Sequence, residues 1–96
     1  MTEHLKSLSA ASVFYFAKQL DNNTVLICDV TMMPLFEYHR TAYAFTLRLF
    51  HGSKSECATV EDVTCDRDKA EHIFNLLCTG NVYPCHLQDI IVDLIA

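Results

Sequence analysis

The segment TAYAFTLRLFH, residues 41–51, decides the fold of this chain. Large apolar side chains alternate along it with residues that are small or polar, apart from one further phenylalanine. One set is Tyr43, Phe45, Leu47 and Leu49, and the other is Ala42, Ala44, Thr46, Arg48 and Phe50. Because successive side chains of a strand point to opposite faces of its sheet, this alternation predicts a strand with one buried face.

The residues before this strand predict a β-hairpin. Residues 13–20, VFYFAKQL, are β-branched and aromatic at their start, and the polar turn 21–23 separates them from residues 24–30, TVLICDV. On the second of these strands one face is fully apolar. Its members are Leu26, Cys28, Val30 and Met32.

A proline and a turn are expected to set the ends of the strands. Pro34 lacks a backbone donor, so we expect it to interrupt the second strand, and we leave residues 35–40 unassigned. A turn at residues 52–55 then leads into a shorter fourth strand at residues 56–63. The four strands together form an antiparallel meander.

The period of the apolar residues changes after the meander. A helical stripe predicts a helix over residues 66–79, capped by Thr64 or Asp66 and stopped by Gly80 in a left-handed conformation. Pro84 suits the first turn of a second helix. The first stripe is Ala70, Ile73, Phe74, Leu77 and Cys78, and the second is Leu87, Ile90, Ile91 and Leu94.

These elements predict an α+β fold, in which an antiparallel four-stranded β-meander is followed by two C-terminal amphipathic helices packed on one face. The larger side chains of the strand at residues 41–51 should lie beneath the helices. A chain of 96 residues has room for one core, so we expect a single domain over residues 1–96. Residues 1–12 are expected to form a flexible or short helical N-terminal segment.

Charge and cysteine content indicate which partners are disfavoured and in which cellular compartment we expect the protein. The formal net charge is -5 and the seven Lys and Arg residues are scattered, which disfavours binding to nucleic acid or to an anionic membrane. The five cysteines are an odd number without a CxxC pair, and the first twelve residues lack the apolar core of a signal peptide. We therefore expect thiols in a cytoplasmic protein.

The C-terminal half contains a recognisable pattern of residues. It consists of Asp62-Val63-Thr64-Cys65-Asp66, followed by Asn81, Val82, Pro84, His86, Leu87 and Asp89. This pattern resembles a family of small clostridial proteins that are classed only as a domain of unknown function. The resemblance implies a bacterial protein. Because such proteins have no assigned activity, it transfers no functional residue to this chain.

Two kinds of chemical site have suitable residues, and each has a structural alternative. His86, with Asp89 and Asp93 on the same helical side, could bind a metal ion, but the same residues are typical of a solvated helix face. Cys65 at a helix N-terminus is the best candidate nucleophile, although neighbouring carboxylates oppose its thiolate. A zinc site would draw on Cys65, Cys78, Cys85 and either His72 or His86, without the close ligand pairs that zinc sites usually have.

The sequence therefore favours a non-catalytic protein-interaction or regulatory module, and leaves enzymatic activity open. No catalytic residue, metal or cofactor is assigned. The expected partner is another protein or a second copy in a homodimer, and the candidate interaction surface contains Phe14, Phe16 and Phe50. The alternative is a small thiol- or metal-dependent protein that uses Cys65, Cys78, Cys85 and His86.

Overall fold

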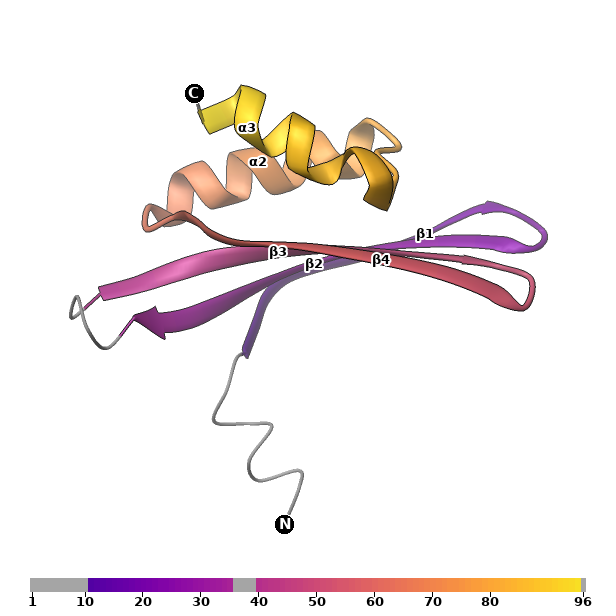
Figure 1. Cartoon of the computed structure of the whole chain (residues 1–96), viewed down its shortest axis with the longest axis horizontal. Helices are drawn as coiled ribbons and strands as arrows, with labels where there is room; N and C mark the ends of the chain where they lie inside the picture. Colours follow the sequence, from indigo (N-terminus) through magenta and orange to yellow (C-terminus); the bar gives the residue numbers. More distant parts are fainter. Residues whose placement is uncertain (1–10, 36–39, 96) are drawn as a thin grey trace, which may run out of the picture.

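The computed structural model describes residues 11–35 and 40–95, and it has the predicted α+β architecture (Figure 1). Four antiparallel strands form one sheet in the order β1-β2-β3-β4, and two helices follow. The elements are β1 Ala11–Asp21, β2 Thr24–Leu35, β3 Arg40–His51, β4 Lys54–Thr64, α2 Arg67–Thr79, the short 3-10 helix η2 Pro84–His86 and α3 Leu87–Ile95.

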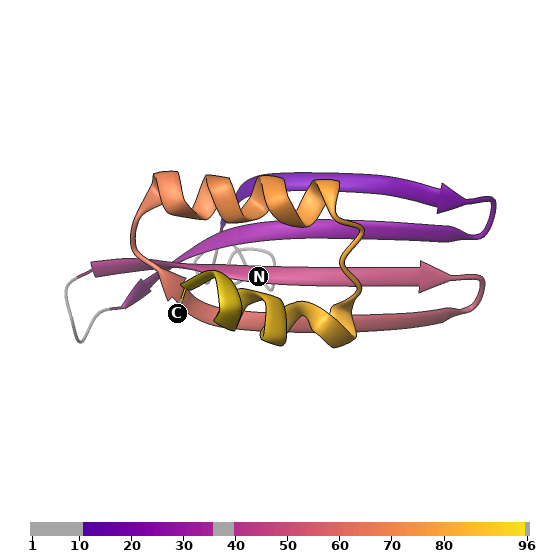
Figure 2. The same ribbon diagram turned by 90° about the horizontal axis from the view of Figure 1, so that it is seen from above.

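Both helices lie on the same face of the sheet. Seen from above, α2 lies along the β1 and β2 side and α3 along the β4 side (Figure 2). The loop between the helices and the 3-10 helix η2 cross from one side of the sheet to the other. In residues 11–35 and 40–95 no helix lies on the opposite face of the sheet, and we call it the helix-free face.

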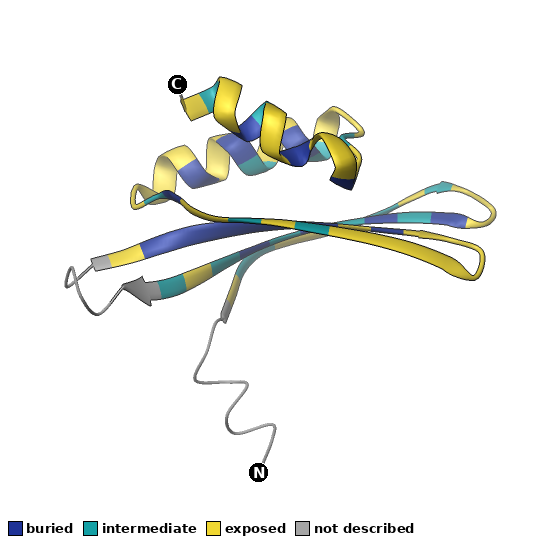
Figure 3. Ribbon diagram, viewed as in Figure 1, coloured by how far each residue is buried: buried dark blue, intermediate teal, exposed yellow. Residues whose placement is uncertain are grey.

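The core lies between the sheet and the helices, as the alternation in residues 41–51 predicts. Phe45 and Leu47 of β3 are fully buried and pair with Val30 and Cys28 of β2. From the helices, the buried members of the two predicted stripes close this layer (Figure 3). They are Ala70, Ile73 and Leu77 of α2 and Leu87 and Ile91 of α3.

Several boundaries of the meander differ from the sequence prediction, and one of them is the start of β4 at Lys54, within the residues predicted as a turn. β2 continues through Pro34, which pairs with Thr41, because the pairing of β1 with β2 reaches only Met32 and leaves this part of β2 at the sheet edge. A proline without a donor is tolerated there. β1 already includes Ser12, so the expected N-terminal segment reaches too far, and its first ten residues lie outside the described part of the chain, as do 36–39.

The ends of α2 confirm one predicted cap and correct another. Asp66 is the N-cap, and its side chain accepts hydrogen bonds from the backbone N–H groups of Asp68 and Lys69. Gly80 is not left-handed: its φ is -94°, and Asn81 takes the left-handed conformation instead, with φ 51°. Asparagine tolerates this conformation better than most residues, so the turn comes one residue later than predicted.

Candidate interaction surface

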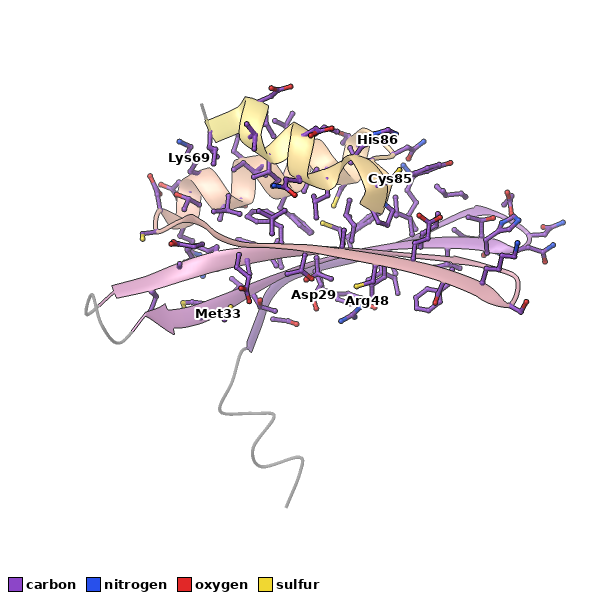
Figure 4. All side chains as sticks on the ribbon, in the orientation of Figure 1. Asp29, Met33, Arg48, Lys69, Cys85 and His86 are labelled. Atoms are coloured by element: carbon purple, nitrogen blue, oxygen red, sulfur yellow. The ribbon has the colours of Figure 1, made fainter. Side chains whose placement is uncertain are left out.

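The helix-free face is a four-stranded surface whose members follow from the strand register. Residues that pair with the core-facing set lie under the helices, so the intervening residues lie on the other side. The register assigns to the helix-free face Ser12, Tyr15, Ala17 and Gln19 of β1, Val25, Ile27, Asp29, Thr31 and Met33 of β2, Ala42, Ala44, Thr46, Arg48 and Phe50 of β3, and Ser55, Cys57 and Thr59 of β4. In Figure 4, Asp29, Met33 and Arg48 point away from the helices.

Two aromatic side chains stand out on this face. Tyr15 is 58% exposed and Phe50 is 42% exposed. Val25 and Ile27, on the strand between them, are half-buried. Large exposed apolar groups that gather on one face commonly mark an interaction site, whereas single ones are ordinary.

The middle of the face contains small residues and a hydroxyl pair. Ala42 and Ala44 are almost completely buried, although the register places them on the helix-free side of the central strand β3. The hydroxyl groups of Thr46 and Thr59 are 3.0 Å apart and form a hydrogen bond across β3 and β4. The centre of the face therefore consists of small buried side chains beside a hydrogen-bonded pair of threonines.

Among the described side chains that the strand pairing places on this face, Asp29 is the one acid and Arg48 the one base. The exposed Glu61 and Asp62 follow at the register shift beyond Val60. Asp29 is half-buried and accepts a hydrogen bond of 2.9 Å from the hydroxyl of Ser12. Arg48 is exposed. Because Asp29 pairs with Thr46 and Arg48 pairs with Ile27, the two charges are diagonal neighbours on the central strands β2 and β3.

The structure separates the three phenylalanines of the predicted surface. Phe14 and Phe16 pair with Val30 and Cys28, and so they lie on the helix side. The Phe14 ring stacks on Phe74 of α2 with 5.4 Å between the centroids, whereas Phe16 is 39% exposed.

Only the third of these phenylalanines, Phe50, lies on the helix-free face, where Tyr15 is the aromatic residue that the sequence analysis did not select. The sequence has aromatic residues at 14, 15 and 16, so alternation alone could not say which of them points outward. The register shift between Gln19 and Asp21 decides the matter, because an unshifted hairpin counted from the pair Asp21 and Thr24 would place Tyr15 opposite Val30, whereas the shift places Phe14 there.

The residues of the alternative thiol or metal site are spread over several elements. Cys65 and Cys85 are exposed, Cys78 is half-buried, and His86 is exposed on η2. None of the five cysteines is in a disulfide, and no three His, Cys, Asp or Glu side chains in the described residues are grouped so that they could hold a metal ion. Burial raises the pKa of the buried Cys28 thiol strongly, and it also raises the pKa of Cys78.

The residues of the C-terminal pattern make turns and caps. Thr64 accepts a hydrogen bond from the backbone N–H of Asp66, which in turn caps α2. The side-chain oxygen of Asn81 accepts a hydrogen bond from Lys18 of β1. Pro84 is buried at the start of η2. Much of the pattern therefore has a role in building the helical layer and joining it to the sheet.

Comparison with known proteins agrees with the pattern in the C-terminal half. No curated protein and no solved structure matches the chain. None of the helices in the described residues combines the length and apolar character needed to cross a membrane. A family model does match residues 46–96, which is just over half of the chain and runs from β3 to the C-terminus. The chain therefore belongs to a family of unknown function (DUF6514).

Proposed function

We propose that this protein is a non-catalytic interaction or regulatory module that binds a protein partner through its helix-free face. The observation that carries the proposal is the pair of exposed aromatic residues, Tyr15 and Phe50, on a sheet face over which neither helix of the described chain lies. An antiparallel sheet can leave one face to solvent, but that face is then normally polar. Here it also presents the aliphatic side chains of Val25 and Ile27.

The charge of the molecule favours a protein over a nucleic acid as the partner. The chain has a formal charge of -5, and among the side chains that the structure describes, Arg48 is the one base that the register assigns to the helix-free face. A nucleic acid would need several bases in a row to displace its counterions. We place this binding in the cytoplasm, a proposal that the five cysteines outside disulfides support.

The helical layer offers a natural comparison surface. Val92 of α3 is 51% exposed, close to the exposed fraction of Tyr15, and Leu76 of α2 is 41% exposed, close to that of Phe50. These two residues stand on separate helices on the other side of the molecule. They serve as controls that are matched in exposure and apolar character.

Site-specific photocrosslinking in cells tests the proposal. A photoreactive phenylalanine analogue is placed at Tyr15 or Phe50, and in parallel at Leu76 or Val92. The proposal expects discrete protein adducts from the first two positions and few from the control positions, with the attached protein identified by mass spectrometry. Equal adduct formation from both layers, or none from Tyr15 and Phe50, would contradict the proposal.

A further inference from the structure

We infer that the partner bound by the helix-free face is a second copy of this chain, related by a two-fold axis that lies in the plane of the interface. This inference rests on the proposed function, because it names the occupant of the same surface. It is carried by the charges on the face and by its area.

The first argument is the neutrality of the face on an acidic molecule. Asp29 and Arg48, the two charges at the middle of the face, cancel, so the excess of -5 belongs to the rest of the chain, which includes the exposed Glu61 and Asp62 at the end of β4. Two copies that approached through other surfaces would bring like charges together, which costs free energy at moderate ionic strength. The helix-free face is where two identical acidic molecules can meet without that repulsion.

The second argument is the position of the two charges. They flank the boundary between the central strands, with Asp29 opposite Thr46 and Arg48 opposite Ile27. In an isologous contact, if one residue meets a second residue of the other copy, the second residue meets the first in return. An in-plane two-fold axis between these side chains brings each Asp29 carboxylate towards the Arg48 guanidinium of the other copy, and two ion pairs form at the centre.

The third argument is area. Four strands at a spacing of about 4.8 Å, each 11 or 12 residues long with a rise of about 3.3 Å, give roughly 700 Å² of face per copy. Two such faces in full contact would cover an outline of roughly 1,400 Å², the same order of size as the about 1,200–2,000 Å² that specific interfaces bury. Tyr15 and Phe50 would be the aromatic anchors of this contact.

The sheet edges are poorer places for a second copy. β1 has irregular register on both sides of its middle, between Ser12 and Phe14 and between Gln19 and Asp21. On β4 the register is irregular near Asp62, which has a positive φ of 54°. Such irregularities protect edge strands from pairing with another sheet. Association through the face is therefore favoured over strand addition.

A charge-reversal series on the purified full-length chain tests the inference. The variants are Arg48→Glu, Asp29→Arg and the double variant, with Lys69→Glu as the control, because it makes the same charge change on the exposed side of α2. Mass is measured by light scattering after chromatography over a concentration series, and circular dichroism checks folding. We expect a wild-type dimer, a dissociation constant raised at least about tenfold in each single variant, and recovery in the double variant. The Lys69→Glu control should dimerise like the wild type.

Cys57 offers a second measurement that needs no substitution. It pairs with Arg48 on the helix-free face, whereas the exposed Cys85 belongs to the helical layer. Alkylation of Cys57 should slow as the protein concentration rises, and alkylation of Cys85 should not. If a charge variant fails to fold, two measurements still test dimerisation through the helix-free face. They are the mass of the Phe50→Glu variant and the ratio of Cys57 alkylation to Cys85 alkylation.

The results that would contradict self-association differ from those that would contradict the proposed function. A wild-type monomer at high micromolar concentration, or a dimer that both single charge variants leave unchanged, overturns the inference. A photocrosslink from Phe50 to residues 1–10 of the same chain would also overturn it, by naming another occupant. If the purified chain is a monomer but Tyr15 and Phe50 attach to a different protein in cells, self-association fails and the proposed function stands.

Discussion

A double-mutant cycle between Phe14 and Phe74 should measure how α2 is held on the edge of the sheet. Their ring centroids are 5.4 Å apart with an interplanar angle of 25°, which is a stacked arrangement. The variants are Phe14→Leu, Phe74→Leu and the combination, since leucine keeps an apolar side chain but removes the ring. Stacked pairs contribute about 0.5–1.5 kcal/mol beyond their buried area, and we expect the coupling energy to fall in this range.

The two single variants should differ in a defined direction. Both rings are half-buried, so each substitution should cost less than the roughly 3–5 kcal/mol of a fully buried phenylalanine truncated to alanine. The Arg67 guanidinium also lies over the Phe14 ring, 5.1 Å from its centroid. Phe14→Leu removes this cation–π contact as well as the stacking, at about 0.5–1 kcal/mol, and should be the more destabilising change.

Urea unfolding of the four proteins gives the free energies of unfolding, with the m-value as a check on two-state behaviour. Phe16→Leu combined with Phe74→Leu is the matched control, because Phe16 lies on the same strand and the same sheet face but forms no ring pair with Phe74. That control should be additive within about 0.3–0.5 kcal/mol. A coupling for Phe14 no larger than the control would refute the idea that the ring pair fastens α2.

Three further results are expected. In dilute native protein a thiol reagent should modify the exposed Cys57 and Cys85 and should reach the buried Cys28 only on unfolding, as peptide mass mapping would show. Because burial raises the pKa of Cys28 above its ordinary value of 9.0, the stability from its protonated form is complete below that pH and is lost above it. Thermal melts should therefore decline above about pH 9, less steeply in Cys28→Ala, and an unchanged slope in that variant would assign the decline to other groups. Asp66→Ala should cost about 0.5–2 kcal/mol in urea melts through loss of the N-cap, whereas Asp66→Asn should cost much less.

The elements of this fold could be predicted because their periods are clear. Phe45 and Leu47 alternate with smaller residues, and Ile73 and Leu77 recur at helical spacing, so one buried face per element follows from geometry alone. All four residues are buried in the core. The predicted side of each of these elements is therefore confirmed.

The predictions that were wrong depend on contacts with residues that are distant in the sequence. Whether Pro34 ends a strand depends on whether another strand lies beside it, and β1 pairs only as far as Met32. Which residue takes the left-handed turn after α2 depends on where the chain must go next. Gly80 and Asn81 both tolerate that conformation, so their order alone could not decide it.

The candidate surface could be predicted only in part for a related reason. A shift of one residue in strand register moves every side chain to the other face of the sheet. With three aromatic residues in succession at the start of β1, both registers present an aromatic residue outward, and the pairing of Phe14 with Val30 decides between them. The chosen register puts a phenylalanine under α2 and leaves outside Tyr15, whose hydroxyl can remain in contact with water. Tests of the interaction surface should therefore substitute Tyr15 and Phe50, because a change at Phe14 would disturb the packing of α2 instead.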